Sequence, residues 1–201
     1  MNKYDSSVDS ILIDQFLNGD GKAFEDLVNK YRGKLYSYLY QMVGDSEAAK
    51  DLFQDVIVKV LKYLPKYEDK QKFSNWLFRI AHNTAISLIQ RHKRKLNIIS
   101  ENTIFDSEIE FSGVLADESF SPETLMNKKE LQQILKSAIQ RLPIEQKEIL
   151  ILREFSEMPF KEIAHMLDCS INTVLGRMRY ALLNLRKIIQ VEIGGESSDV
   201  L

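Results

Sequence analysis

The chain has few of the residues that build disulfide-stapled or turn-rich proteins. Its 201 residues include one cysteine, four prolines and eight glycines. The single cysteine, Cys169, excludes an intramolecular disulfide, so nothing in the sequence indicates an oxidising compartment. Scarce glycine and proline mean few turns. Together with many Leu, Ile, Lys and Glu residues, this composition favours long helices over short strands.

Long apolar runs and reactive clusters are also missing. No stretch approaches the roughly 20 apolar residues of a membrane span, and residues 1–13 contain no signal-peptide core. We therefore expect a soluble, cytoplasmic protein. The sequence has no glycine-rich phosphate loop, and its three histidines and one cysteine form no nucleophile–base pair or metal-ligand cluster. An enzyme is the least favoured class, and we expect no catalytic residue, cofactor or metal.

Charge is plentiful but sharply segregated along the chain, although the net charge is only −2. Residues 1–56 hold ten acidic and six basic side chains. Residues 71–95 carry six basic side chains and no acid, whereas residues 96–127 carry seven acids and no Lys or Arg. Residues 169–190 again carry only basic charge. Two basic surfaces joined by an acidic connector are the pattern that a functional interpretation must explain.

Apolar periodicity predicts a helical N-terminal domain over residues 1–95. Apolar side chains recur at helical spacing within residues 24–43, 46–64 and 76–89. Gly44, Asp45 and Ser46 interrupt the pattern, and either Asp45 or Ser46 is suited to cap the next helix. These segments predict three or four packed helices with a shared core.

The second half of the chain predicts a linker and another helical domain. Residues 96–124 lose the periodicity and are rich in Ser, Asp, Glu and Asn, which predicts an acidic flexible linker. Residues 125–193 predict helices that begin near Pro122 and Pro143, with two shorter segments after them. Residues 194–201 are expected to form a frayed tail. The predicted fold class is all-α, with two small helical domains.

The segment from Phe160 to Leu185 has the architecture of a helix-turn-helix. Small Ala164 lies where a second helix must cross closely. Asp168 lies in the turn, which requires a positive φ that Asp tolerates better than most residues. Ser170 is suited to cap the second helix, and Val174 begins the apolar side that packs it down.

The outer face of that second helix combines base-edge readers with phosphate-binding arginines. The alternative is an ordinary amphipathic hairpin with a solvated basic face, but the turn chemistry and the lack of acid on the second helix argue against it. The predicted DNA-contacting residues are Ser170, Asn172, Thr173, Leu175, Gly176, Arg177, Arg179 and Tyr180.

Three motifs in this order resemble bacterial sigma factors. Residues 51–61 read DLFQDVIVKVL and resemble the DLxQEVF helix with which sigma factors grip RNA polymerase. Residues 73–85 read FSNWLFRIAHNTA and resemble their F-x-x-W-L-x-R-I-A-x-N promoter-melting helix. The helix-turn-helix resembles the fourth sigma region. The resemblance covers about residues 22–190, and the short connector points to the extracytoplasmic-function (ECF) group.

The resemblance implies a sigma factor that directs core RNA polymerase to specific promoters and initiates transcription. It implies docking to the coiled-coil clamp of the largest polymerase subunit. An acidic and amide stripe at Asp51, Gln54 and Asp55 suits a basic partner surface, the alternative being a plain solvated face. The predicted polymerase-binding residues are Asp51, Leu52, Gln54, Asp55, Ile57 and Val58. A conventional helix-turn-helix regulator with an N-terminal sensing or dimerisation domain is the alternative function.

Promoter melting at the minus-ten element needs phosphate contacts and pockets for unstacked bases. The predicted minus-ten residues are Lys72, Asn75, Arg79, His82, Asn83, Arg91, Lys93 and Arg94. For the basic run at residues 91–95, the alternative is a solvated helix end. The spacing of Trp76 with Ile80 favours a place in the core over a stacking platform, whereas the evidence for Phe73 is balanced.

The resemblance also assigns partners and points to one departure. The partners are core polymerase and promoter DNA, which is double-stranded at minus-thirty-five and melted at minus-ten. An anti-sigma factor is common in the family, and this sequence identifies none. The acidic linker suits the basic channels of the polymerase, with a passive spacer as the alternative.

Related sigma factors usually place a polar or basic residue at Leu175 and serine at Gly176. Here we expect a thymine-methyl contact and a close backbone approach instead.

Overall fold

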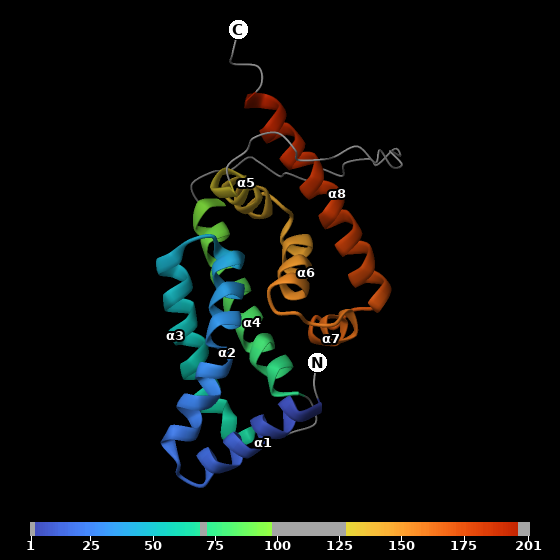
Figure 1. Cartoon of the computed structure of the whole chain (residues 1–201). Helices are drawn as coiled ribbons and strands as arrows, with labels where there is room; N and C mark the ends of the chain where they lie inside the picture. Colours follow the sequence, from blue (N-terminus) through green and yellow to red (C-terminus); the bar gives the residue numbers. More distant parts are fainter. Residues whose placement is uncertain (1–2, 69–71, 98–127, 197–201) are drawn as a thin grey trace.

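The computed structural model describes residues 3–68, 72–97 and 128–196, and every regular element in these ranges is a helix. The predicted linker and the helix start near Pro122 lie outside the described residues, apart from residues 96 and 97. The helices are α1 (Lys3–Leu17), α2 (Gly21–Val43), α3 (Ser46–Tyr63), the 3-10 helix η1 (Leu64–Lys66), α4 (Phe73–Asn97), α5 (Lys128–Gln140), α6 (Ile144–Glu154), α7 (Phe160–Met166) and α8 (Ile171–Glu196). We call α1–α4 the N-terminal unit and α5–α8 the C-terminal unit (Figure 1).

Local capping sets the helix boundaries in the N-terminal unit. The Asp20 side chain caps α2 by accepting a hydrogen bond from the Lys22 N–H at 2.9 Å. Gly44 ends α2 with a φ of 79°, and its N–H donates to the Tyr40 carbonyl. The cap of α3 is Asp45, which accepts from the Ala48 N–H at 2.8 Å. The break predicted between these two helices is therefore confirmed.

Helix α1 was not predicted from the sequence. Its apolar residues are spread around the helix, and Val8, Ile11 and Leu17 are exposed. A buried acid helps to hold α1 in place: Asp9 accepts hydrogen bonds from Lys30 Nζ at 2.7 Å and from the Tyr31 hydroxyl at 2.6 Å, both on α2. Because a buried carboxylate requires such partners, α1 depends on α2 for its position.

The two units share one hydrophobic core. Ile149, Ile151 and Leu152 of α6 are fully buried in the same cluster as Leu39 of α2 and Phe78 of α4. Figure 1 shows α6 beside α2 and α4, with α7 at the N-terminal end of α4. Two helical units were predicted, as found, but the sequence did not indicate that α6 would complete the core of the N-terminal unit.

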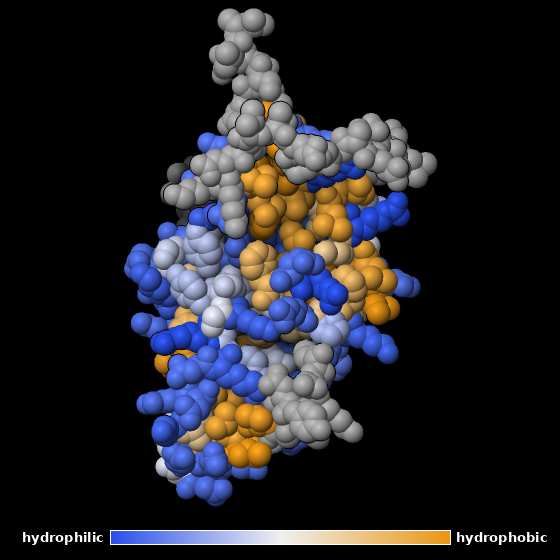
Figure 2. Space-filling model, viewed as in Figure 1, coloured by the Kyte–Doolittle hydropathy of each residue, from blue (hydrophilic) through white to orange (hydrophobic). Residues whose placement is uncertain are grey.

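The outer helices of the C-terminal unit differ from the expected pattern. Instead of two shorter segments, α7 has 7 residues and α8 has 26 and continues to Glu196, past the start of the predicted tail. Leu131 and Leu135 of α5 are exposed, as is Leu182 of α8. Figure 2 shows hydrophobic residues gathered where Figure 1 places α5, α6 and α8.

Gly44 provides a test of how the two units meet. A Cβ at Gly44 would lie 3.0 Å from Gln140 Oε1 of the C-terminal unit, and its φ is left-handed. We expect Gly44→Ala to lower the free energy of unfolding by about 1–2 kcal/mol. Gly33→Ala is the control, because its Cβ meets nothing within 4 Å. This variant should raise the free energy of unfolding by up to about 1 kcal/mol. Urea unfolding measures both, and equal changes would contradict the prediction.

Candidate nucleic-acid and polymerase interfaces

The turn between α7 and α8 has the geometry that the sequence predicts. Asp168 adopts a φ of 52°, and the Cys169 N–H donates to the Ala164 carbonyl at 3.0 Å. Ser170 caps α8, because its Oγ accepts from the Thr173 N–H at 3.0 Å. Val174 is fully buried. The helix-turn-helix is therefore formed, with α8 as its second helix.

The first turns of α8 expose most of the predicted DNA-contacting residues. The exposed side chains are Ser170, Asn172, Thr173, Leu175, Arg179 and Tyr180, while Gly176 and Arg177 are half-buried. A Cβ at Gly176 would meet no atom within 4 Å, so packing within the protein gives no reason for glycine there. The hydroxyls of Ser170 and Thr173 lie 2.9 Å apart and belong to the helix cap.

Helix α3 presents the predicted acidic stripe to solvent. Asp51, Gln54 and Asp55 are exposed, and Val58 beside them is 64% exposed. Leu52 departs from the prediction, because only 3% of it is exposed and it packs in the core. Leu52, Val56 and Val60 recur every four residues and so share the buried side of α3. Ile57 is half-buried against the same core.

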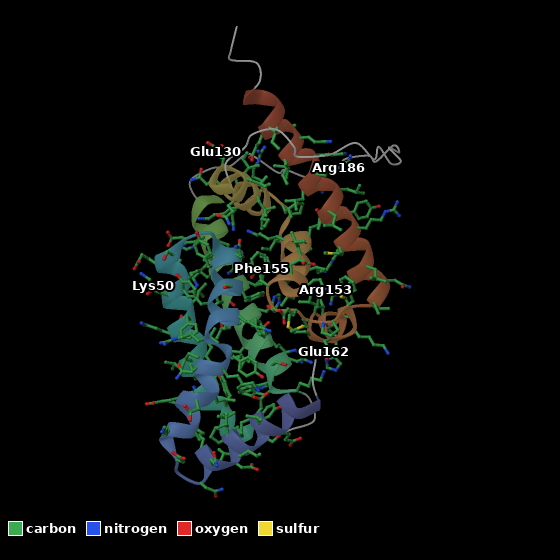
Figure 3. The ribbon with its side chains drawn as sticks, in the orientation of Figure 1. Lys50, Glu130, Arg153, Phe155, Glu162 and Arg186 are labelled. Atoms are coloured by element: carbon green, nitrogen blue, oxygen red, sulfur yellow. The ribbon has the colours of Figure 1, made fainter. Side chains whose placement is uncertain are left out.

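The predicted minus-ten residues divide into a solvent-facing set and a set that contacts the C-terminal unit. Asn83, Arg91 and Arg94 are exposed, Asn75 is half-buried, and the side chain of Lys93 lies outside the described residues. In the second set Lys72 is exposed, and Arg79 and His82 are half-buried. Lys72 Nζ lies 2.6 Å from Glu162 Oε1, and Arg79 Nη2 donates to the His165 carbonyl at 2.7 Å. His82 Nδ1 contacts Glu148 Oε1. Figure 3 labels Glu162 on α7.

The aromatic residues at the start of α4 belong to a packed cluster. Phe73 is buried, with its ring centroid 5.7 Å from that of Trp76 and 5.9 Å from that of Tyr67. Trp76 is half-buried, 5.0 Å from the Tyr67 ring. Phe73 therefore has a core role. Trp76 packs against that core, in agreement with the interpretation of its spacing.

Two buried charged residues of α6 were missed by the sequence reasoning. Lys147 is 7% exposed, and its Nζ donates to the Met42 carbonyl at 3.1 Å. Glu148 is 5% exposed and lies against α4. The sequence carried one weak signal: both residues adjoin the apolar run at residues 149–152, where a helix that is covered on several sides buries every position.

The Glu148 carboxylate of α6 affects the pKa of the buried Tyr38 phenol in the N-terminal unit. Tyr38 is completely buried and packs edge-on against Phe78, with ring centroids 5.5 Å apart. Burial raises the pKa of Tyr38 well above its ordinary value, and the nearby Glu148 carboxylate raises it further. Both effects disfavour the phenolate, so Tyr38 is neutral.

No described helix has the length and apolar character that crossing a bilayer requires. The described residues contain no group of three or more His, Cys, Asp or Glu side chains arranged to hold a metal ion.

Comparison with known proteins identifies both units. Residues 17–95 match the family model for Sigma-70 region 2, and residues 132–185 match the model for Sigma-70, region 4. This pair, in this order, defines a sigma-70-type transcription initiation factor. The match to region 2 decides against a conventional regulator with a sensing domain.

Individual sigma factors that are similar to this chain show to which group of the family it belongs. RNA polymerase sigma-H factor of Pseudomonas aeruginosa is 33% identical over 90% of this chain and 94% of its own length. ECF RNA polymerase sigma-E factor of Escherichia coli K12 is 32% identical over 85% of this chain and 88% of its own. The sigma factor RpoE of Bartonella quintana, solved with the anti-sigma factor NepR, shares the fold with a TM-score of 0.64 and 22% identity, over 85% of this chain and 98% of that one. The chain belongs to the ECF group of RNA polymerase sigma factors, which direct the polymerase to promoters.

Substitutions on α3 separate its buried side from its exposed side. Leu52→Ala removes a buried side chain, and we expect it to lower the free energy of unfolding by about 2–5 kcal/mol. Val58→Ala acts on an exposed side chain and should change stability by no more than about 0.5 kcal/mol. Thermal unfolding compares the two variants. A large destabilisation by Val58→Ala would show that this face is packed in the free protein.

Proposed function

We propose that three surfaces of this sigma factor divide the work of promoter recognition. The exposed side of α3, formed by Asp51, Gln54, Asp55 and Val58, docks on the core polymerase. The basic side of α4 holds the melted minus-ten element, and the first turns of α8 read the minus-thirty-five element in the major groove. Leu52 supports the α3 surface from beneath and is left out of the contact set.

The observation that carries this proposal is the exposed start of α8. A capped helix that is anchored by α7 presents Asn172, Thr173, Leu175 and Arg179 to solvent. An amide, a hydroxyl and a methyl-bearing side chain match the groups that base edges offer, while arginine binds phosphates. Helix N-termini also favour phosphate through their free N–H groups. This set of groups suits recognition of duplex DNA.

The remaining roles follow from the proposed docking. The chain contributes no catalytic group, since nucleotide addition belongs to the polymerase, and it acts in the cytoplasm, where bacterial polymerase transcribes. An anti-sigma factor is a further class of partner, since a relative of the same fold is solved with one. The exposed leucines of α5 and α8 offer an apolar surface for such a protein partner.

Charge substitutions test the division of labour. Arg177→Ala with Arg179→Ala should weaken minus-thirty-five binding by the holoenzyme and lower the salt slope by about 2, leaving core binding intact. Asp51→Ala with Gln54→Ala and Asp55→Ala should instead weaken core binding. Core pull-down and promoter binding across salt concentrations measure both effects.

The control for the arginine pair is Lys22→Ala with Arg32→Ala, which removes the same charge from exposed positions of α2. It should change neither measurement by more than the small non-specific effect of charge. If the purified chain neither binds core polymerase nor directs promoter-dependent transcripts, the proposed function is wrong.

Gly176 tests the close approach of DNA to α8. The Cβ of Gly176→Ala meets no protein atom, so the variant should raise the free energy of unfolding by up to about 1 kcal/mol. The same methyl should lower minus-thirty-five affinity, because it projects where DNA docks. Gly33→Ala, the matched helix-interior control, should gain stability with unchanged DNA affinity. A stabilised Gly176→Ala with normal affinity would show that DNA does not approach this position.

A further inference from the structure

One side of α4 meets oxygen atoms of the C-terminal unit at three places. Lys72, Arg79 and His82 are spaced by seven and three residues, which sets them along one side of the helix. Their partners are the Glu162 carboxylate, the His165 carbonyl and the Glu148 carboxylate. These contacts lie along the N-terminal part of α4, up to His82, and join it to α6 and α7.

These three partners offer the chemistry that a nucleic-acid strand would offer. Lysine and arginine bind phosphate through charge-assisted hydrogen bonds to anionic oxygens, and histidine also contacts phosphate oxygens. A carboxylate presents the same kind of anionic acceptor, and a backbone carbonyl presents a neutral one. We infer that α6 and α7 act as an intramolecular mimic of the promoter strand. In the free protein this mimic occupies the part of the minus-ten face that Lys72, Arg79 and His82 form. This inference rests on the proposed function of that face.

The end of α2 supplies an anchor that keeps the mimic in place. The last carbonyls of a helix have no partner within it. Gln140 Nε2 donates to the Gln41 carbonyl at 2.7 Å, and Lys147 Nζ donates to that of Met42 at 3.1 Å. The cation also lies at the negative end of the helix dipole. Two side chains of the C-terminal unit thus cap a helix of the N-terminal unit, and Gly44 leaves room for their approach.

Two further contacts across the junction are more exposed. Lys34 Nζ lies 2.7 Å from Glu157 Oε2, with 49% and 73% of the two side chains exposed. The Lys34 ammonium lowers the pKa of Glu157 through their hydrogen bond. Lys136 Nζ lies 4.7 Å above the centre of the Tyr40 ring. Exposed ion pairs contribute little, so the buried contacts at Glu148 and Lys147 dominate the closure.

Closure has a direct consequence for binding. A ligand that binds only the open arrangement has its affinity reduced by the fraction of molecules that are open. Single-stranded DNA must therefore compete with the carboxylates of α6 and α7. Core polymerase, which docks on the uncovered side of α3, would favour the open arrangement only if it binds that arrangement more tightly.

The first arm of the test uses the full chain without polymerase and short single-stranded DNA of mixed sequence. Glu148→Gln with Glu162→Gln keeps the side-chain shapes but removes both negative charges from the mimic. We expect the variant to bind the DNA roughly tenfold more tightly than the unchanged chain, the scale of a charge-assisted hydrogen bond. Fluorescence anisotropy measures the affinity.

The matched control is Glu145→Gln with Glu154→Gln. It removes the same two charges from exposed positions of α6, so it reports the gain expected from net charge alone. The mimic is overturned if the Glu148 and Glu162 variant gains no more affinity than this control.

The second arm measures the separation of the two units without DNA. Spin labels at Lys50→Cys on α3 and Leu182→Cys on α8, with Cys169→Ser in every protein compared, give a distance distribution by electron resonance. The Glu148 and Glu162 variant should show a longer population that is absent from the control. An unchanged distribution overturns the inference, even if DNA affinity rises.

The holoenzyme separates the failure of this inference from the failure of the proposed function. If the unchanged chain directs promoter-dependent transcripts from core polymerase but the variant neither opens nor gains DNA affinity, only the mimic is wrong. If the units open as expected but neither the unchanged protein nor the variant directs transcripts, the proposed function is wrong. The interpretation of the minus-ten face of α4 as a DNA site is then wrong as well.

Discussion

The docking of α5 and α6 on the end of α2 joins the two units. A helix ends with carbonyl groups that need hydrogen-bond donors. The Gly44 N–H donates to the Tyr40 carbonyl, and the side chains of Gln140 and Lys147 donate to the carbonyls of Gln41 and Met42. The same contact carries Ile149 and Ile151 into the core of the N-terminal unit. Polar capping and apolar burial therefore act at one place, and each fixes the geometry that the other needs.

This docking decides which basic and acidic surfaces are available. The acidic stripe of α3 and the start of α8 face solvent on different helices, whereas Lys72, Arg79 and His82 face the C-terminal unit. The proposed function uses all three surfaces at a promoter. The arrangement described here thus leaves the proposed polymerase-docking and duplex-reading surfaces open. It covers part of the proposed minus-ten surface, at Arg79 and His82, while Asn83, Arg91 and Arg94 stay exposed.

Features that depend on local backbone chemistry were predicted well. The positive φ at Asp168 and the cap at Ser170 follow from the intrinsic preferences of those residues, and each was found where the sequence placed it. Features that depend on partners distant in sequence were not predicted. Helix α1 relies on a buried contact of Asp9 with Lys30 and Tyr31 of α2.

The sequence by itself determined the helical class, the two units, the helix-turn-helix and the segregation of charge, because periodicity, caps and turn residues act over a few positions. Only the tertiary structure decided that the two units share a core and that Glu148 and Lys147 are buried at their junction. The physical reason is that a charged side chain is buried only where oxygen atoms or cations of the protein become its partners. Such partners can lie about a hundred residues away along the chain, as Met42 does from Lys147.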